Sequence, residues 1–423
     1  MKKHLWILAV AALGLASCSN DDVVAENTGL SDANTISFRA LNSGMTRAAD
    51  EHFSTAGDKF GVTAFKKNDT TDPYFDNVTF STTDGATFTS ETKHYWPSST
   101  NLDFYAYAPL NSENTGVTRT AYNSFTVTPG TTVSSQPDLV YAVTRNWGKS
   151  TSDQTTGHVI PTATGVTINF RHAESKVAIK LANTNANLKI TVGDVAIGNL
   201  RGTETFTWNG VTDGTTPIVA ASANTDGKYT TGTLTYLNGT WTATSAQTSV
   251  YSVPMETATS YNVFNGVVAA KNLYSAPASA PNYDMILIPQ ALNVATAYAN
   301  SGTAAIGDAF AGAYITVKIK IQNSAANADE YIVGSASGGG TGEDSNGYVT
   351  AMWPLTTLTW LPGHMYTYTV DLAGGGYFTT NQDDNADLDP ILEGAEIKFV
   401  TVTVDDWTAV GGSIYETGLP NQP

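Results

Sequence analysis

An all-β fold built from sandwiches is what this sequence predicts, and three observations carry the prediction. Apolar and polar residues alternate in many short runs, as strands with one buried face require. Gly, Asn, Asp and Pro separate these runs, and the favoured polar residue is threonine, whose β-branched side chain suits a pleated sheet. No stretch keeps a helical period over a useful length, because the best candidate, residues 291–311, is interrupted by Gly302 and Gly307.

The predicted strands follow one another along the whole chain. They are residues 36–40, 60–64, 102–108, 166–170, 177–181, 234–236, 285–288, 315–321, 366–370 and 397–404. A polar, turn-rich interval at 145–165 places a domain boundary near residue 160, which gives an N-terminal sandwich at 35–160 and a C-terminal one at 161–423. Flexible loops are expected at 335–347 and 381–390.

Composition limits the function classes. The 423 residues carry 21 Lys+Arg against 38 Asp+Glu, a formal net charge of −17, and such a chain repels phosphate backbones, so nucleic-acid binding is not expected. Hydrophobic residues make up 41%, which is enough to bury a core and argues against wholesale disorder. The single cysteine excludes an intramolecular disulfide.

That cysteine stands in an informative place near the N-terminus. Met1-Lys2-Lys3 is a short basic start, and an apolar run at 5–15 and small residues follow it, which is the pattern of a secretory signal over residues 1–17. The sequence Leu-Ala-Ser-Cys ending at Cys18 resembles a bacterial lipobox, in which the cysteine becomes the first mature residue and carries lipid such as palmitate. The alternative is an ordinary signal with an incidental cysteine. Residues 18–34 are polar and acidic and read as a tether.

Catalytic and cofactor motifs are not found in the sequence. The six histidines lack metal-ligand spacing, Val143 stands where a phosphate loop ending in Gly148-Lys149-Ser150 needs glycine, and no Gly-x-Ser-x-Gly elbow occurs. We therefore expect that the protein is not an enzyme and that it binds no cofactor.

Two weaker binding signals remain. Asp383, Asn385 and Asp387 could offer oxygen ligands to calcium, but Leu388 and Gly394 stand where an EF-hand needs glycine and glutamate, so a solvated acidic loop is favoured. Four aromatic residues could stack on sugars or, more commonly, fill a β core. These are Tyr74, Phe75, Tyr122 and Trp147.

Taken together, several local stretches resemble the fimbrillin family, the subunits of type V pili of Gram-negative anaerobes. Their order over nearly the whole chain carries the resemblance. They are the lipobox with acidic residues after it and residues 36–40, 44–48, 95–97, 102–109, 169–177, 285–290 and 358–368. The resemblance implies two transthyretin-like β-sandwich domains in tandem, after a lipoprotein signal peptide and flexible tether.

The family also implies assembly by strand exchange. A first strand, at about 35–41, would leave its groove after an arginine-specific surface protease cuts, and a neighbour's C-terminal strand would replace it. Alternation places Ile36, Phe38 and Ala40 toward the groove. Arg47, in a polar segment just past the strand, is the expected cleavage site. Arg39 is the rival, and the alternative is that neither is cut.

The resemblance further implies other pilus subunits as partners through β-strand addition, a lipid anchor in the outer membrane, and a ligand on a host or bacterial surface. The protein would be an outer-membrane lipoprotein at the cell surface and then part of the fimbrium. Residues 397–404 look like a resident core strand, and the tail at 408–423 has few apolar anchors, which favours a tip or accessory subunit over a stalk subunit.

Two further expectations complete the sequence reading. Asp69-Thr70-Thr71 resembles a short O-glycosylation acceptor, with Thr70 as the modified residue. The alternative function is a surface glycan-binding lipoprotein that is tethered at Cys18 and needs no cleavage at Arg47.

Overall fold

The computed structural model describes most of the chain between residues 34 and 406, and the statements below concern these residues. They are 34–40, 53–67, 69–112, 116–148, 158–159, 165–168, 170–208, 233–236, 239–255, 261–274, 284–292, 312–325, 330–380, 387–395, 397 and 401–406. Apart from short 3-10 turns, which include η2 (Val133–Ser135) and η3 (Leu372–Gly374), the regular structure within these ranges is β-strand, so the all-β prediction is confirmed. No helix in them is long and apolar enough to cross a membrane.

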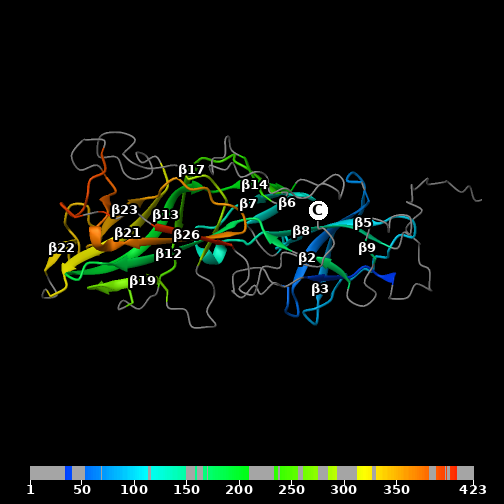
Figure 1. The fold of residues 1–423 in the computed structure, drawn as a ribbon, viewed down its shortest axis with the longest axis horizontal. Helices are drawn as coiled ribbons and strands as arrows, with labels where there is room; N and C mark the ends of the chain where they lie inside the picture. Colours follow the sequence, from blue (N-terminus) through cyan, green and yellow to red (C-terminus); the bar gives the residue numbers. More distant parts are fainter. Residues whose placement is uncertain are drawn as a thin grey trace, which may run out of the picture.

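Two lobes lie end to end along the long axis of the molecule (Figure 1). The larger sheet of the first lobe curls so that β10 lies near β8. Its strands, in spatial order, are β10 (Val166–Ile168), β1 (Phe38–Ala40), β4 (Phe88–Thr89), β3 (Pro73–Thr82), β2 (Lys59–Lys66), β5 (Leu102–Ala108), β8 (Val140–Gly148) and β11 (Arg171–His172), with β9 (His158–Val159) beside β8. The second sheet contains β15 (Thr233–Tyr236), β16 (Gly239–Thr242), β14 (Glu204–Trp208), β7 (Ser124–Val127) and β6 (Val117–Ala121).

Strand β2 shows how the larger sheet is buried on both faces. Phe60, Val62 and Ala64 point into a cluster enclosed by the curled sheet, whereas Phe65 points to the other face and joins the cluster under the second sheet. On that second face Tyr141 of β8 stacks on Trp208 of β14, with ring centroids 5.1 Å apart and an angle of 18° between the rings. The first lobe therefore has two apolar layers.

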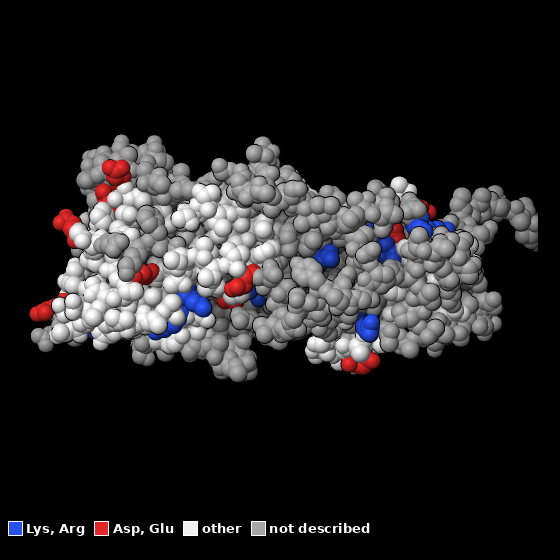
Figure 2. Space-filling view, viewed as in Figure 1, with Lys and Arg blue, Asp and Glu red and all other residues white. Residues whose placement is uncertain are grey.

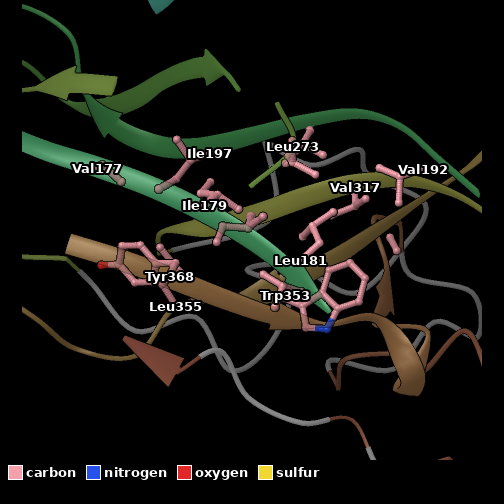
Figure 3. Close-up of a cluster of buried hydrophobic side chains, with 14 of the residues drawn as sticks. Val177, Ile179, Leu181, Val192, Ile197, Leu273, Val317, Trp353, Leu355 and Tyr368 are labelled. Carbon is pink, nitrogen blue, oxygen red and sulfur yellow. The ribbon is translucent and has the colours of Figure 1, made fainter. Parts of the chain in front are cut away.

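The second lobe is a sandwich of two sheets. One sheet contains β19 (Val268–Asn272), β12 (Ser175–Asn183), β24 (His364–Asp371) and β26 (Thr401–Asp406), with β20 (Met285–Leu287) beside β12. The other contains β17 (Gln247–Ser252), β13 (Leu188–Arg201), β21 (Tyr314–Asn323), β23 (Val349–Pro354) and β25 (Tyr377–Phe378), with β18 (Val263–Asn265) beside β13 and β22 (Tyr331–Val333) beside β21. Figure 3 shows Val177, Ile179 and Leu181 of β12 projecting into the core between the sheets.

Strand pairing crosses the predicted boundary near residue 160. β10 and β11 follow that residue yet pair within the first lobe, and β14, β15 and β16 return from the C-terminal half to complete the smaller sheet of the first lobe. The chain then enters the second lobe again at β17. The boundary itself stays a prediction, but the two lobes share one interleaved chain path.

Figure 2 shows that the described surface of the second lobe, on the left, is mostly uncharged, with a few Lys, Arg, Asp and Glu side chains scattered over it. This sparseness agrees with a chain of which only 14% is charged. Extended uncharged segments are the ones that can pair edge to edge without like-charge repulsion.

Candidate functional site

The first strand of the chain is held on both sides by the sheet of the first lobe. β1, the dark-blue arrow in the right-hand lobe of Figure 1, runs parallel to β10 and pairs with β4 through Phe38 and Phe88. Just before it, the backbone N–H of Ile36 donates to the carbonyl of His94 over 2.7 Å. The N–H of Val166 donates to the carbonyl of Ser37 over 2.8 Å. The segment 34–40 thus fills a slot between other strands.

Its apolar side chains enter the enclosed core. Phe38 is 0% exposed, and its ring makes edge contacts with Phe80, Phe104 and Phe60 at centroid distances of 4.7, 5.0 and 6.1 Å. Ile36 is 2% exposed. Ala40 is half-buried and packs against the same cluster, and the side chain of Arg39 is exposed.

Removing β1 would open an apolar groove. Phe60, Phe80, Phe88 and Phe104 are all fully buried, and three of them touch Phe38 directly. The backbone groups of β10 that now pair with β1 would lose their partners. An apolar trough beside unpaired backbone is the geometry that recruits another strand by β-augmentation.

A glycine sets the close approach of backbone to β1. Gly165 has φ +75°, and a Cβ built on it would lie 2.7 Å from the carbonyl oxygen of Ser37 and 2.9 Å from the nitrogen of Phe38. A residue with a side chain would therefore push against the strand as well as strain its own backbone. The slot for β1 is therefore shaped by Gly165 at its rim as well as by the buried phenylalanines beneath the strand.

The two arginines proposed for cleavage differ in placement. Arg39 is the middle residue of β1 and pairs in register with Thr167 of β10, so its peptide group lies inside a sheet, whereas proteolytic nicking favours exposed loop tips. Arg47 and the lipidation candidate Cys18 lie outside the described residues. Both roles stay predictions.

The last described strand is placed quite differently. β26 pairs only with β24 among the described strands and forms an edge of its sheet. Val402 is half-buried against the core of the second lobe, whereas Val404 is 47% exposed. The described part of the predicted strand 397–404 therefore lies in the subunit's own sheet, as expected for a resident strand, but 401–406 form the edge of that sheet. Its face pattern offers few buried anchors, because Thr401, Thr403 and Asp405 are exposed.

The remaining predicted sites are only partly within the described residues. Thr70 is exposed, next to Asp69, whose carboxylate accepts hydrogen bonds from the backbone N–H and the hydroxyl of Thr71, both at 2.8 Å. These bonds, the backbone one first, lower the pKa of Asp69. Of the calcium candidates, Asp383 and Asn385 lie outside the described residues and Asp387 within them. No group of three or more His, Cys, Asp or Glu side chains gathers as a metal site in the part of the chain that the structure describes.

The aromatic residues considered as sugar platforms contribute instead to the packing of the first lobe. Phe75 and Trp147 are buried. Tyr74 donates its hydroxyl to the carbonyl of Tyr95 over 2.8 Å, and Tyr122 packs its ring against Phe65 and Tyr105. The core alternative therefore holds for Phe75 and Trp147, whose rings are buried, whereas Tyr74 and Tyr122 are half-buried and sugar stacking on them stays a prediction.

One polar cluster that no sequence motif indicates lies on the outer face of the second lobe. Lys318 of β21 places its Nζ 2.9 Å from Asp194 of β13 and 3.2 Å from Asp344. Lys320, two residues along the same strand, lies over the rings of Tyr348 and Tyr331. The signal that could have indicated it is the alternation in 315–321, which places both lysines on one face.

Comparison with known proteins gives a consistent group of matches. A family model described as fimbrillin-like matches residues 46–407. No match was found among curated proteins.

Among solved structures, the chain is similar to a candidate cell adhesion protein from Bacteroides uniformis, with 16% identity and a TM-score of 0.44, covering 90% of this chain and 100% of that one. It is also similar to the tip fimbrial protein Mfa3 from Porphyromonas gingivalis, with 8% identity and a TM-score of 0.35, covering 88% of this chain and 99% of that one. A fimbrilin from the same organism has 12% identity and a TM-score of 0.33, covering 89% of this chain and 98% of that one.

Proposed function

Because this chain belongs to the fimbrillin-like family, we propose that it is a structural and adhesive pilus subunit, exported as a lipoprotein and assembled by strand exchange. The observation that carries the exchange step is β1. Segment 34–40, which contains β1 and contributes Ile36 and Phe38 to an otherwise closed apolar core, is a segment whose departure creates a binding groove.

The proposed order of events begins at the membrane. Lipid on Cys18 holds the exported chain at the outer membrane, with its two lobes as transthyretin-like sandwiches. An arginine-specific protease then cuts after Arg47, and β1 leaves with the released segment. A strand from a neighbouring subunit enters the groove lined by Phe60, Phe80 and Phe104. The proposal assigns no catalytic role and no cofactor to the chain.

The choice of Arg47 over Arg39 has a physical basis. A protease binds its substrate as an extended chain in its own cleft, and Arg39 lies inside a sheet with β10 on one side. A cut after Arg39 would also fall within β1 itself and leave Ala40 on the mature chain. A cut after Arg47 releases all of 34–40.

N-terminal sequencing of protein recovered from the cell surface tests this order. We expect mature protein to begin at Ala48, and Arg47→Ala to abolish both the cut and the fibres seen by electron microscopy. Arg39→Ala is the matched control and should leave the cut and the fibres intact. A surface protein that still begins at Cys18 while fibres form would contradict the proposal.

The place of the subunit in the pilus is a separate proposal. The tail at 408–423 offers few apolar residues for a donor strand, and β26 is sparsely anchored, so we place the subunit at the tip or in an accessory position. Deleting 408–423 should then leave incorporation of the subunit unchanged. Loss of incorporation in immunogold labelling of pili would assign the tail a donor role instead.

Two smaller proposals accompany the main one. Thr70, exposed beside Asp69, is proposed as an O-glycosylation acceptor, and mass spectrometry of peptides containing Thr70 decides it. The acidic loop around Asp383, Asn385 and Asp387 is proposed to be solvated without bound calcium. Titration calorimetry that detects calcium binding, and loses it in Asp387→Asn, would overturn that assignment.

A further inference from the structure

The polar cluster on the outer face of the second lobe begins with an irregularity in a strand. The pairing of β13 with β21 shifts register between Val192 and Val195, so Gly193 and Asp194 form a bulge. Bulges turn side chains away from the regular alternation. Here the bulge presents the carboxylate of Asp194, which is 83% exposed, while Lys318 fixes its Oδ2 at 2.9 Å.

A closed loop supplies a second fixed carboxylate. The sequence predicts flexibility for 335–347, but hydrogen bonds close this loop: the N–H of Ser335 donates to the carbonyl of Gly347, and Ser335 Oγ donates to Glu343 over 2.7 Å. Asp344 Oδ1 accepts from the N–H groups of Asn346 and Tyr348 at 2.9 and 3.0 Å, and its Oδ2 lies 3.2 Å from Lys318. These bonds lower the pKa of Asp344, that from Tyr348 most. The carboxylate is thus charged and held in place.

Two tyrosines stand beside these carboxylates. The Nζ of Lys320 lies 4.6 Å from the ring centroid of Tyr348 and 5.7 Å from that of Tyr331, and both rings stay half exposed. Tyr348 lies close against the bulge, because a Cβ on Gly193 would come within 3.3 Å of its ring. Burial, followed by the nearby groups Asp344, Tyr331 and Asp194, raises the pKa of the Tyr348 hydroxyl. Like any tyrosine hydroxyl at neutral pH, it carries its proton and can donate a hydrogen bond.

These groups together form a set of pre-positioned donors and acceptors next to aromatic surface. We propose that Asp194, Lys320, Tyr331 and Tyr348 form a binding site for a neutral saccharide. The exposed carboxylate of Asp194 can accept from sugar hydroxyls, and the ammonium of Lys320, which donates one hydrogen bond to the carbonyl of Ala336 over 3.3 Å, has further N–H groups to donate to them. Tyrosine rings accept the apolar C–H face of a pyranose. Lys318 and Asp344 act as positioning residues, because they hold Asp194 and Tyr348 in place.

Charge selects a neutral partner over an anionic one. Lys318 is paired with two carboxylates, and Lys320 is near the carboxylate of Glu343, so no cation of the cluster is left uncompensated. The chain as a whole carries −17 and repels acidic sugars.

The cluster lies far from the groove of β1. β22, which carries Tyr331, lies at the far end of the second lobe in Figure 1, away from β2 and β3 beside the groove of β1. Filling that groove with a neighbour's strand would not cover it. The inference therefore does not depend on strand exchange, and binding by the purified monomer is measured separately from fibre formation.

The test uses the purified full mature chain on an array of neutral oligosaccharides from host mucins and from bacterial surface polysaccharides, with sialylated and sulfated glycans as a comparison. The strongest neutral ligand is then titrated by calorimetry. Asp194→Asn, at an exposed side chain, should weaken binding at least about tenfold, and Tyr331→Ala should weaken it similarly. Asp72→Asn, an exposed aspartate of the first lobe, should leave affinity unchanged.

Several outcomes overturn the assignment. They are binding of acidic glycans only, absence of neutral glycan binding above background, or equal affinity of wild type and Asp194→Asn. Lys318→Arg keeps the ion pairs with Asp194 and Asp344 and should retain binding, whereas Lys318→Ala should weaken it while the denaturation midpoint stays unchanged. Preference for host or for bacterial glycans identifies the source of the ligand.

Discussion

The first and the last described strands differ in what holds them. β1 has only three residues, yet it pairs with β10 on one side and β4 on the other and buries Phe38 completely. β26 is twice as long and makes six register pairs with β24, but its other edge has no partner among the described strands, and most of its side chains are exposed.

The difference separates two sources of strand stability. A net backbone hydrogen bond contributes about 1 kcal/mol, whereas a fully buried large apolar side chain contributes about 1.5–3 kcal/mol. β26 has the longer ladder, and β1 has the deeper anchors. In a subunit that exchanges a strand, the groove must be apolar, so that only a strand with apolar side chains can fill it. The groove that holds β1 is of this kind.

Replacing the main anchor of β1 should have the largest effect. Phe38→Ala removes a ring that contacts three other phenylalanines, and the enclosed cluster cannot collapse fully around the gap. We expect the free energy of unfolding of the uncleaved chain to fall by about 3–5 kcal/mol in urea denaturation. A loss below about 1 kcal/mol would mean that the groove does not depend on this ring.

Alkaline pH ionises one buried tyrosine in each lobe. Its effect on stability tests whether the two lobes differ in more than their first and last strands. Burial raises the pKa of Tyr105 in the first lobe and of Tyr251 in the second to about 12. In the unfolded chain these tyrosines ionise near pH 10. The contribution of each neutral tyrosine to the free energy of unfolding is therefore complete below about pH 10 and is lost as pH rises toward 12, by up to about 2–3 kcal/mol for each tyrosine.

Tyr105→Phe and Tyr251→Phe should each reduce that loss when denaturation is measured at pH 9 and pH 11.5. Equal loss of stability in wild type and in both variants would show that other groups control the alkaline limit.

A change on the rim of the slot should act on β1 from outside. Gly165→Ala places a Cβ against Ser37 and Phe38 at positive φ, and we expect a loss of about 2 kcal/mol in the free energy of unfolding. Gly394→Ala is the matched control, since its φ is +73° but nothing lies within 4 Å of the added Cβ, and about 1 kcal/mol is expected there from backbone strain alone. Equal losses in the two variants would remove the contact with β1 from the explanation.

The smallest effect is expected at the other end of the comparison. Val404→Ala in β26 removes a side chain that is 47% exposed, so the free energy of unfolding should change by less than about 0.5 kcal/mol. A loss as large as that of Phe38→Ala would erase the distinction between the two strands.

Local patterns in the sequence predict many of the strands well. The alternation at 102–108 corresponds to β5, that at 315–321 lies within β21, and that at 366–370 lies within β24. These predictions succeed because side-chain alternation is a property of adjacent residues. The fimbrillin resemblance likewise rests on local stretches, among them 102–109 and 358–368.

Pairing between distant segments is beyond such patterns. The residues around Trp208 do not predict that its side chain packs on Tyr141, and the alternation within β14 does not predict which lobe this strand joins. The bulge at Asp194 was likewise hidden, because one inserted residue changes the face of a side chain without changing the composition around it. For the four aromatic residues considered for sugar binding, the sequence does not distinguish an exposed ring from a ring in the core. Only the packing in the structure does.

The return of β14, β15 and β16 to the first lobe has a consequence for the order in which the molecule matures. A chain that is synthesised and exported from its N-terminus presents β1 early, but the smaller sheet of the first lobe cannot close before Thr242 has emerged. Until β14 has emerged, Tyr141 lacks the rings of Phe206 and Trp208 that pack against it. The second apolar layer of the first lobe therefore closes only when a segment far along the chain, β14 to β16, has returned to it.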